Sequence, residues 1–137
     1  MATTKSWIKA ARPRTLPLAL SGIIMGCGLA WFYSTIDVTV SVLAIVTATL
    51  IQVFSNFAND YGDSQRGTDN EFRLGPTRTV QSGEITHKEM ETGMLIVGGL
   101  SFLSGLWLVY SGTWHHSKGA FLSFIGLGIL SLIAAYF

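Results

Sequence analysis

Residues 52–69 read QVFSNFANDYGDSQRGTD. The stretch begins inside a run without charged residues and ends with three aspartates within ten positions. If a helix continues through it at about 100° per residue, five polar side chains fall within an arc of roughly 100°: Gln52, Asn56, Asn59, Asp60 and Asp63. Carboxylates at the end of an apolar helix are costly to desolvate, by about 2.5–3.5 kcal/mol each at a bilayer centre and less near its edge. We therefore expect a divalent cation to compensate them.

The composition indicates a membrane protein. Only 12% of the 137 residues are charged and 49% are hydrophobic, whereas a soluble domain carries about 25% charged residues. The mean hydropathy is +0.44. A net charge of +1 gives no basis for a nucleic-acid partner. The length allows one domain at most, so residues 1–137 are taken as one unit.

Four stretches without Asp, Glu, Lys, Arg or His are long enough to cross a membrane, which takes about 20 residues. They predict an all-α, polytopic transmembrane helix bundle with four spans at about 16–36, 38–59, 92–114 and 119–137. Small residues in such spans let neighbouring helices approach closely. We expect this packing role for a set of glycines: Gly22, Gly26, Gly28, Gly98, Gly99, Gly105, Gly126 and Gly128.

The positive charges predict the orientation, because cytoplasmic loops carry an excess of Lys and Arg. The N-terminal segment and the loop at about 58–91 hold most of them: Lys5, Lys9, Arg12, Arg14, Arg66, Arg73, Arg78 and Lys88. We place both segments on the cytoplasmic side of a multi-pass protein in the inner membrane. The two opposite segments hold only Asp37 and Lys118, beside two histidines. No polar anchor follows the last span, so we expect the N-terminal part of a longer protein.

The loop at about 58–91 carries the residues suited to chemistry. Asp60, Asp63 and Asp69 offer oxygen ligands of the kind that Mg²⁺ accepts while it also binds substrate phosphates. Asp60 and Asp63 share a helix face, whereas Asp69 must fold back to join them. Three arginines nearby can bind phosphate bidentately: Arg66, Arg73 and Arg78. The pattern predicts a site for a lipid diphosphate, whose departure a metal ion would assist.

Other interpretations of these charges stay open. Loop charges are often merely solvated, and we assign that role to Glu71, Lys88, Glu89 and Glu91. Thr86 and Glu89 have the spacing of a capping box, which predicts that the third helix starts near His87. From another functional class, the chain could be a small four-helix membrane transporter that uses Asp60 and Asp63 as its coupling-ion site.

The motifs, taken together, resemble a known family. The segments are WIKAARPRTLPLAL (7–20), SNFANDYGD (55–63), RGTD (66–69), GPTR (75–78) and QSGEIT (81–86). They are similar to the UbiA superfamily of intramembrane prenyltransferases and, within it, to the 1,4-dihydroxy-2-naphthoate polyprenyltransferases of menaquinone biosynthesis. The similarity follows the whole chain in order.

The resemblance implies a bundle of nine membrane helices, of which this chain would supply the first part. In such an enzyme, polyprenyl diphosphate is held with Mg²⁺ between two Asp-rich loops. The diphosphate leaves, and the allylic cation alkylates 1,4-dihydroxy-2-naphthoate, which loses its carboxylate and gives demethylmenaquinol. Membrane lipid surrounds the bundle.

The resemblance also assigns roles to residues. Asp60 and Asp63 carry over as catalytic Mg²⁺ ligands, and Asn56 and Asn59 as polar support for the site. Arg66, Arg73 and Arg78 are assigned as contacts of the diphosphate, and Arg12 is placed near the cytoplasmic entrance of the same site. The superfamily's third aspartate would fall at Gly67, so Asp69 follows the subfamily form. The second Asp-rich motif lies outside this chain, and we expect the chain alone to be inactive.

Overall fold

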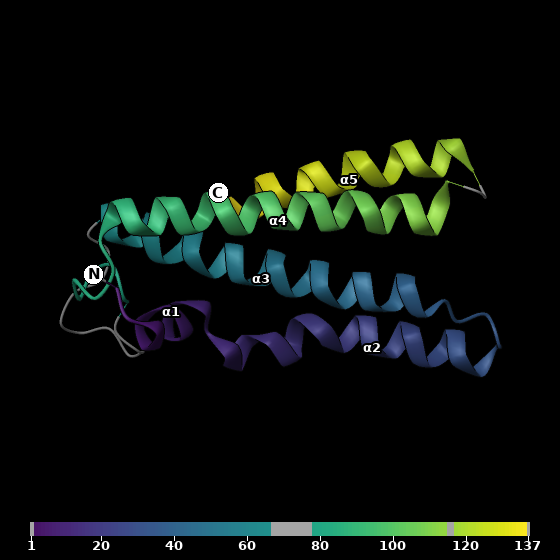
Figure 1. Cartoon of the computed structure of the whole chain (residues 1–137), viewed down its shortest axis with the longest axis horizontal. Helices are drawn as coiled ribbons and strands as arrows, with labels where there is room; N and C mark the ends of the chain where they lie inside the picture. The colour runs from purple at the N-terminus through teal and green to yellow at the C-terminus, as the bar shows by residue number, and fades with distance from the viewer. Residues whose placement is uncertain (1, 67–77, 115–116, 137) are drawn as a thin grey trace.

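The computed structural model describes residues 2–66, 78–114 and 117–136, most of which lie in helices. In order these are α1 (Thr4–Ala11), the short 3₁₀ turn η1 (Pro13–Thr15), α2 (Leu16–Phe32), α3 (Val38–Arg66), α4 (His87–Thr113) and α5 (Lys118–Tyr136). The four long helices run side by side along one axis, and α1 lies at one end of the bundle (Figure 1). The predicted all-helical membrane bundle is confirmed.

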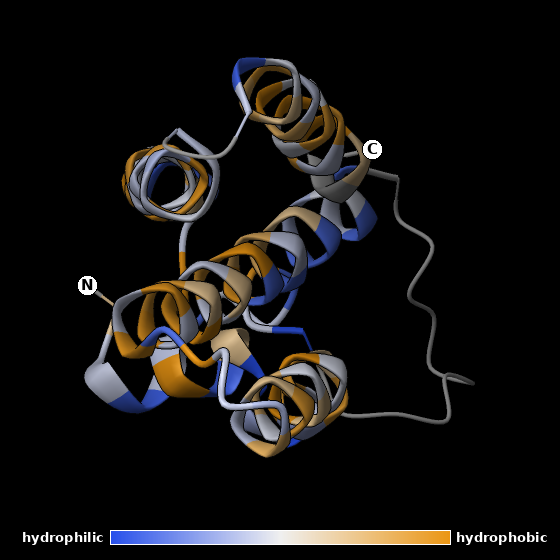
Figure 2. Ribbon diagram, turned by 90° about the vertical axis from the view of Figure 1, so that its right-hand side faces the viewer, coloured by the Kyte–Doolittle hydropathy of each residue, from blue (hydrophilic) through white to orange (hydrophobic). Residues whose placement is uncertain are grey.

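Within the described residues, three helices are long and apolar enough to cross a membrane: α2 taken together with α1, α3, and α4. The described part of α5 is equally apolar in character but shorter. Large apolar side chains point outward from three of these helices, with Leu18 83%, Leu95 78% and Leu122 69% exposed. Viewed end-on, the ribbons of the long helices carry hydrophobic colour over much of their length (Figure 2). A soluble protein rarely exposes so much contiguous apolar surface.

The helix ends differ from the predicted spans in one instructive way. α3 continues to Arg66, seven residues past the end of its predicted span, because the first charges mark the edge of the apolar region and not the end of the helix. α4 begins at His87, as the capping box predicted. The Thr86 hydroxyl accepts the Glu89 N–H at 3.2 Å, and the Glu89 carboxylate accepts the Thr86 N–H at 2.9 Å.

The buried apolar core sits at the same end of the bundle as α1. Its members come from α1, α3, α4 and the segment before α4: Ala10, Phe57, Ala58, Val80, Ile85, Met90 and Met94. Trp7 of α1 packs on this cluster, with its ring centroid 5.4 Å from that of Phe57. The core therefore fixes α1 against α3 and α4, just where the aspartates of α3 lie.

Glycines allow close helix contacts, although not all at the predicted positions. A Cβ atom on Gly93 would lie 2.7 Å from the Trp7 ring, one on Gly98 would lie 3.1 Å from Phe54, and one on Gly105 would lie 3.6 Å from Thr47. The predicted packing role is thus confirmed for two of the glycines. The other six meet no described atom within 4 Å: Gly22, Gly26, Gly28, Gly99, Gly126 and Gly128.

Candidate functional site

The polar stripe on α3 divides into two halves with different partners. In its first half, the Asn56 side-chain amide donates to the Ala11 carbonyl at 2.8 Å and to the Thr15 hydroxyl at 3.1 Å. Gln52 donates to the Asn56 side-chain carbonyl at 3.3 Å. Asn56 is buried, so these bonds satisfy it inside the protein. This half of the stripe anchors the turn that joins α1 to α2.

That turn places Arg12 in an unusual backbone conformation. Its φ is 50°, in the left-handed region, which costs a residue other than glycine about 1–2 kcal/mol. The turn is held by the Arg12 carbonyl, which accepts the Thr15 N–H and the Thr15 hydroxyl, each at 2.9 Å. Pro13 follows, and its ring fixes the next φ. The strained turn sets the direction of the basic segment at residues 12–14.

Asp60 opens the second half of the stripe and is almost completely buried, with 1% of its surface exposed. One carboxylate oxygen, Oδ2, accepts two hydrogen bonds from Thr79: the backbone N–H at 3.1 Å and the hydroxyl at 2.6 Å. The other oxygen, Oδ1, is buried and has no hydrogen-bond partner among the described residues. A buried carboxylate oxygen without a partner is costly, so this atom is suited to a cation.

Arg78 lies between the two acids. Its guanidinium forms an ion pair with the Asp63 carboxylate, and only 8% of the Arg78 side chain is exposed. Burial lowers the pKa of Arg78, the nearby Arg12 lowers it further, and the Asp60 carboxylate raises it. Arg12 and Asp60 are therefore both close enough to act on Arg78 electrostatically. An arginine stays charged under these influences.

A cavity of about 240 Å³ brings these groups together. It is lined by residues of α1, η1, α3 and the segment before α4: Lys9, Arg12, Pro13, Arg14, Asp60, Arg78 and Thr79. Four cationic side chains and one carboxylate line it. Two of the cations are paired with acids beside the cavity, Arg78 with Asp63 and Lys9 with Glu84, and Arg12 and Arg14 leave the lining suited to an anion. The same lining contains the buried carboxylate with its unpartnered oxygen. The residues present therefore fit an anion that is bound together with a metal ion.

The structure brings some of the predicted site residues together and leaves others apart. Arg12, Asp60 and Arg78 line the cavity, and Asp63 reaches it through its ion pair. Asn59 is exposed on α3. Arg66 is the last residue of α3, while Asp69 and Arg73 lie outside the described residues. Within the described part of the chain, no group of three or more His, Cys, Asp or Glu side chains could hold a metal ion.

Three polar lining residues were not predicted as site residues from the sequence. Lys9 and Arg14 were interpreted only as charges that orient the chain in the membrane, although their spacing around Arg12 places them in one short basic segment. Thr79 directly follows the GPTR motif, but nothing in its type or position predicts that it would bond to a carboxylate. Its role depends on the fold.

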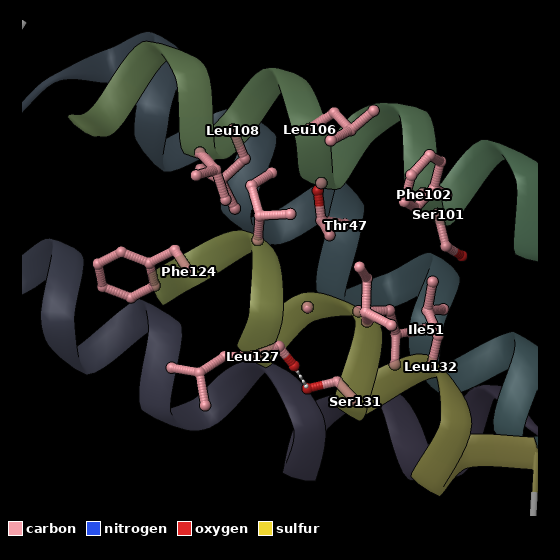
Figure 3. Close-up of a pocket in the computed structure, with 15 residues that line it drawn as sticks. Thr47, Ile51, Ser101, Phe102, Leu106, Leu108, Phe124, Leu127, Ser131 and Leu132 are labelled. Atoms are coloured by element: carbon pink, nitrogen blue, oxygen red, sulfur yellow. Dashed lines mark hydrogen bonds between the residues drawn. The ribbon is translucent and has the colours of Figure 1, made fainter. Parts of the chain in front are cut away.

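A second cavity, of about 320 Å³, lies between α3, α4 and α5. Figure 3 shows its lining, in which Ile51, Phe102 and Leu132 are typical. Its few polar groups are already engaged: Thr47 donates to Ser104 at 3.1 Å, and Ser131 donates to the Leu127 carbonyl at 2.9 Å. None of its described lining residues is charged. These residues can accommodate an apolar group but offer no acid, base or cation for chemistry.

Comparisons with known proteins agree on one family. The model of the UbiA prenyltransferase family matches residues 19–137. Three similar curated proteins carry the name 1,4-dihydroxy-2-naphthoate octaprenyltransferase. The one from Escherichia coli (strain K12) is 46% identical over 96% of this chain and 42% of its own length. The one from Haemophilus influenzae is 44% identical over the same shares. The one from Mycobacterium tuberculosis is 37% identical over 88% of this chain and 41% of its own length.

The chain thus spans about two fifths of the length of these relatives. No solved structure gives a significant match. The comparisons give no support to the alternative of a small transporter. The geometry also disfavours it, because transporter ion sites are typically formed by discontinuous helices near the midplane, whereas α3 is unbroken from Val38 to Arg66 and carries its acids at one end.

Proposed function

The chain belongs to the UbiA prenyltransferase family, and on that premise we propose that it forms the N-terminal, diphosphate-binding part of a 1,4-dihydroxy-2-naphthoate polyprenyltransferase. The complete enzyme would move a polyprenyl group, octaprenyl in the relatives' names, from its diphosphate to the naphthoate ring. The allylic carbon–oxygen bond breaks, a carbon–carbon bond forms at the ring, and the carboxylate leaves as carbon dioxide. The products are demethylmenaquinol, diphosphate and carbon dioxide.

One observation carries the proposal: the small cavity combines four cations with a buried carboxylate. Guanidinium groups bind phosphate oxygens bidentately, so Arg12, Arg14 and Arg78 are assigned to the diphosphate, with Lys9 at the rim. Arg66 and Arg73 remain proposed contacts from the adjoining loop. Asn56 contributes by holding the turn that carries Arg12, and Asn59 is proposed as polar support.

Asp60, through Oδ1, and Asp63 are proposed to hold Mg²⁺, with Asp69 as a third ligand. When bound, the ion would supply positive charge that stabilises the departing diphosphate. In the structure Asp63 is paired with Arg78, so the arginine neutralises one of the two proposed ligands. Binding of a diphosphate would draw the Arg78 guanidinium towards phosphate, because a phosphate group carries more negative charge than a carboxylate.

The orientation in the membrane belongs to the same proposal. We assign the end of the bundle with α1, the core and the aspartates to the cytoplasmic side of the inner membrane, on the basis of its basic residues. The apolar surfaces of α2, α4 and α5 would then face lipid. Cysteine-labelling of an Asp37→Cys variant and a Lys88→Cys variant in intact cells tests this assignment. Labelling of Lys88→Cys alone by an impermeant reagent would reverse it.

The activity is tested with the longer enzyme that contains this chain. Purified protein is supplied with polyprenyl diphosphate, 1,4-dihydroxy-2-naphthoate and Mg²⁺, and demethylmenaquinol is measured. Asp63→Ala is expected nearly to abolish product. Asp37→Asn is the matched control, since Asp37 caps the opposite end of α3 by accepting the Val40 N–H at 3.0 Å. Turnover of Asp63→Ala at the wild-type rate would count decisively against the metal role.

A further inference from the structure

The hydrogen bonds of Asp60 are asymmetric in a way that the proposed metal role does not by itself require. Both donors from Thr79 reach the same oxygen, Oδ2, and Oδ1 receives none among the described residues. A carboxylate free to rotate exposes either oxygen to a ligand. Here the side chain is fixed, with Oδ2 accepting two hydrogen bonds and Oδ1 accepting none from the described residues.

Thr79 is itself held rigidly enough to impose this asymmetry. Its carbonyl accepts the Ile85 N–H at 3.1 Å, which closes a tight loop from residue 79 to residue 85. Gly83 turns this loop with a φ of 74°, a conformation that glycine adopts without strain. On either side of the loop, Val80 and Ile85 are buried in the core. The Thr79 hydroxyl is thus fixed by the core, not by a mobile surface segment.

The acceptor of the Thr79 hydroxyl differs from that of most serine and threonine hydroxyls in the described residues. Many of them donate to the backbone carbonyl four positions earlier, as Ser41, Thr49, Thr92 and Thr113 do. The Thr79 hydroxyl instead donates to a carboxylate 19 positions earlier in the chain. With 1% of its surface exposed, Thr79 could be replaced by a valine of the same shape if packing were its only role.

We propose that Thr79 is a positioning residue for the metal ligand Asp60, and that it holds Oδ2 so that Oδ1 is presented to the cation bound with the diphosphate. This inference rests on the proposed function, because it assumes that Asp60 binds the metal. Groups that orient a metal ligand by hydrogen bonding typically account for about 10–100-fold in metal affinity. The backbone N–H of Thr79 remains after any substitution, so we expect the lower end, about tenfold.

The test measures metal binding directly in the longer enzyme. Mn²⁺ serves as the probe, its binding is followed by electron paramagnetic resonance in the presence of polyprenyl diphosphate, and melting temperatures are recorded. Thr79→Val removes the hydroxyl and keeps the shape, and is expected to weaken Mn²⁺ binding about tenfold. Thr79→Ser keeps the donor and is expected to bind as tightly as wild type. High Mg²⁺ should restore much of the turnover of Thr79→Val.

Thr47→Val is the matched control, because Thr47 is also buried and also loses a bond to another side chain, that to Ser104. It is expected to bind Mn²⁺ like wild type. Thr79→Ala serves in the same assay if Thr79→Val does not fold. Wild-type Mn²⁺ affinity in the variant without the hydroxyl, or equal weakening in Thr79→Ser, would overturn the positioning role.

A further variant separates the two proposals. Asp60→Asn is expected to lose Mn²⁺ binding. If Asp60→Asn loses binding and Thr79→Val does not, the positioning role fails and the proposed metal site survives. If Asp60→Asn binds Mn²⁺ like wild type, the metal site itself fails, and the role of Thr79 fails with it.

Discussion

The substitution Gly93→Ala tests how α1 packs on the rest of the bundle. A Cβ atom at this position would lie 2.7 Å from two carbons of the Trp7 ring and 3.7 Å from Phe57. Ordinary carbon–carbon contact begins near 3.5 Å, so the indole in Gly93→Ala must retreat by about 0.8 Å. Trp7 already packs on the Phe57 ring, and overpacking of this kind costs about 1–3 kcal/mol.

The displacement should reach the cavity as well as the core. Trp7 shares α1 with Lys9, and the strained turn at Arg12 follows directly. A misplacement of about 1 Å in a group that positions substrate can cost up to about 100-fold in rate. We therefore expect Gly93→Ala to lower both the melting temperature and the kcat/KM for polyprenyl diphosphate in the longer enzyme.

Gly99→Ala is the matched control, because it lies in the same helix and meets no described atom within 4 Å. Both substitutions gain the same helix propensity, about 1 kcal/mol, so their difference isolates the contact with Trp7. Trp7→Leu combined with Gly93→Ala should recover part of the lost stability. If Gly93→Ala and Gly99→Ala have the same melting temperature and the same kcat/KM, the described packing of α1 on α4 through Trp7 and Gly93 is wrong.

Three further predictions concern the ends of α1 and the stripe. Arg12→Gly should melt higher than Arg12→Ala, by the equivalent of about 1 kcal/mol, while both lose product; equal melting would contradict the left-handed turn. The Lys9 ammonium, 2.5 Å from the Glu84 carboxylate, lowers the pKa of Glu84 below its usual value. That stabilisation is present above the unfolded-state pKa of about 4.3 and is lost as the pH falls through the lower folded pKa. On acidification, the melting temperature of the wild type should therefore fall further than that of Glu84→Gln. Parallel plots of melting temperature against pH would refute the contribution of the Lys9–Glu84 ion pair. Asn56→Ala should cost about 1–3 kcal/mol by removing the donor to the partly buried Ala11 carbonyl and Thr15 hydroxyl, whereas exposed Asn59→Ala should melt like wild type.

Features set by neighbouring residues could be predicted from the sequence. The apolar runs predicted the helices because each helix satisfies its own backbone groups, which is what a membrane requires. The start of α4 depends only on the reciprocal bonds between Thr86 and Glu89. The polar stripe on α3 followed from helical periodicity alone. These are local properties, and they transfer from sequence to structure without knowledge of the fold.

Features that join distant segments could not be predicted. The bonds from Thr79 to Asp60 and the contact of Trp7 with Gly93 depend on how the helices pack. Asn56 was predicted as polar support for the site, but not as a donor to the Ala11 carbonyl and the Thr15 hydroxyl. Lys9 carries a charge whose side of the membrane can be predicted, while its place in a cavity wall depends on the turn at Arg12.

The concentration of the core at one end of the bundle has a consequence for biosynthesis. Its seven residues extend from Ala10 to Met94, and chains emerge from the ribosome N-terminus first. α1 is made first and can pack on Phe57 once α3 follows, but the core is completed only by Val80, Ile85, Met90 and Met94, which are synthesised later. Asp60 of α3 likewise precedes its partner Thr79 in synthesis. The candidate site can therefore form only after residues 78–94 have been synthesised, and assembly of this end of the protein depends on them.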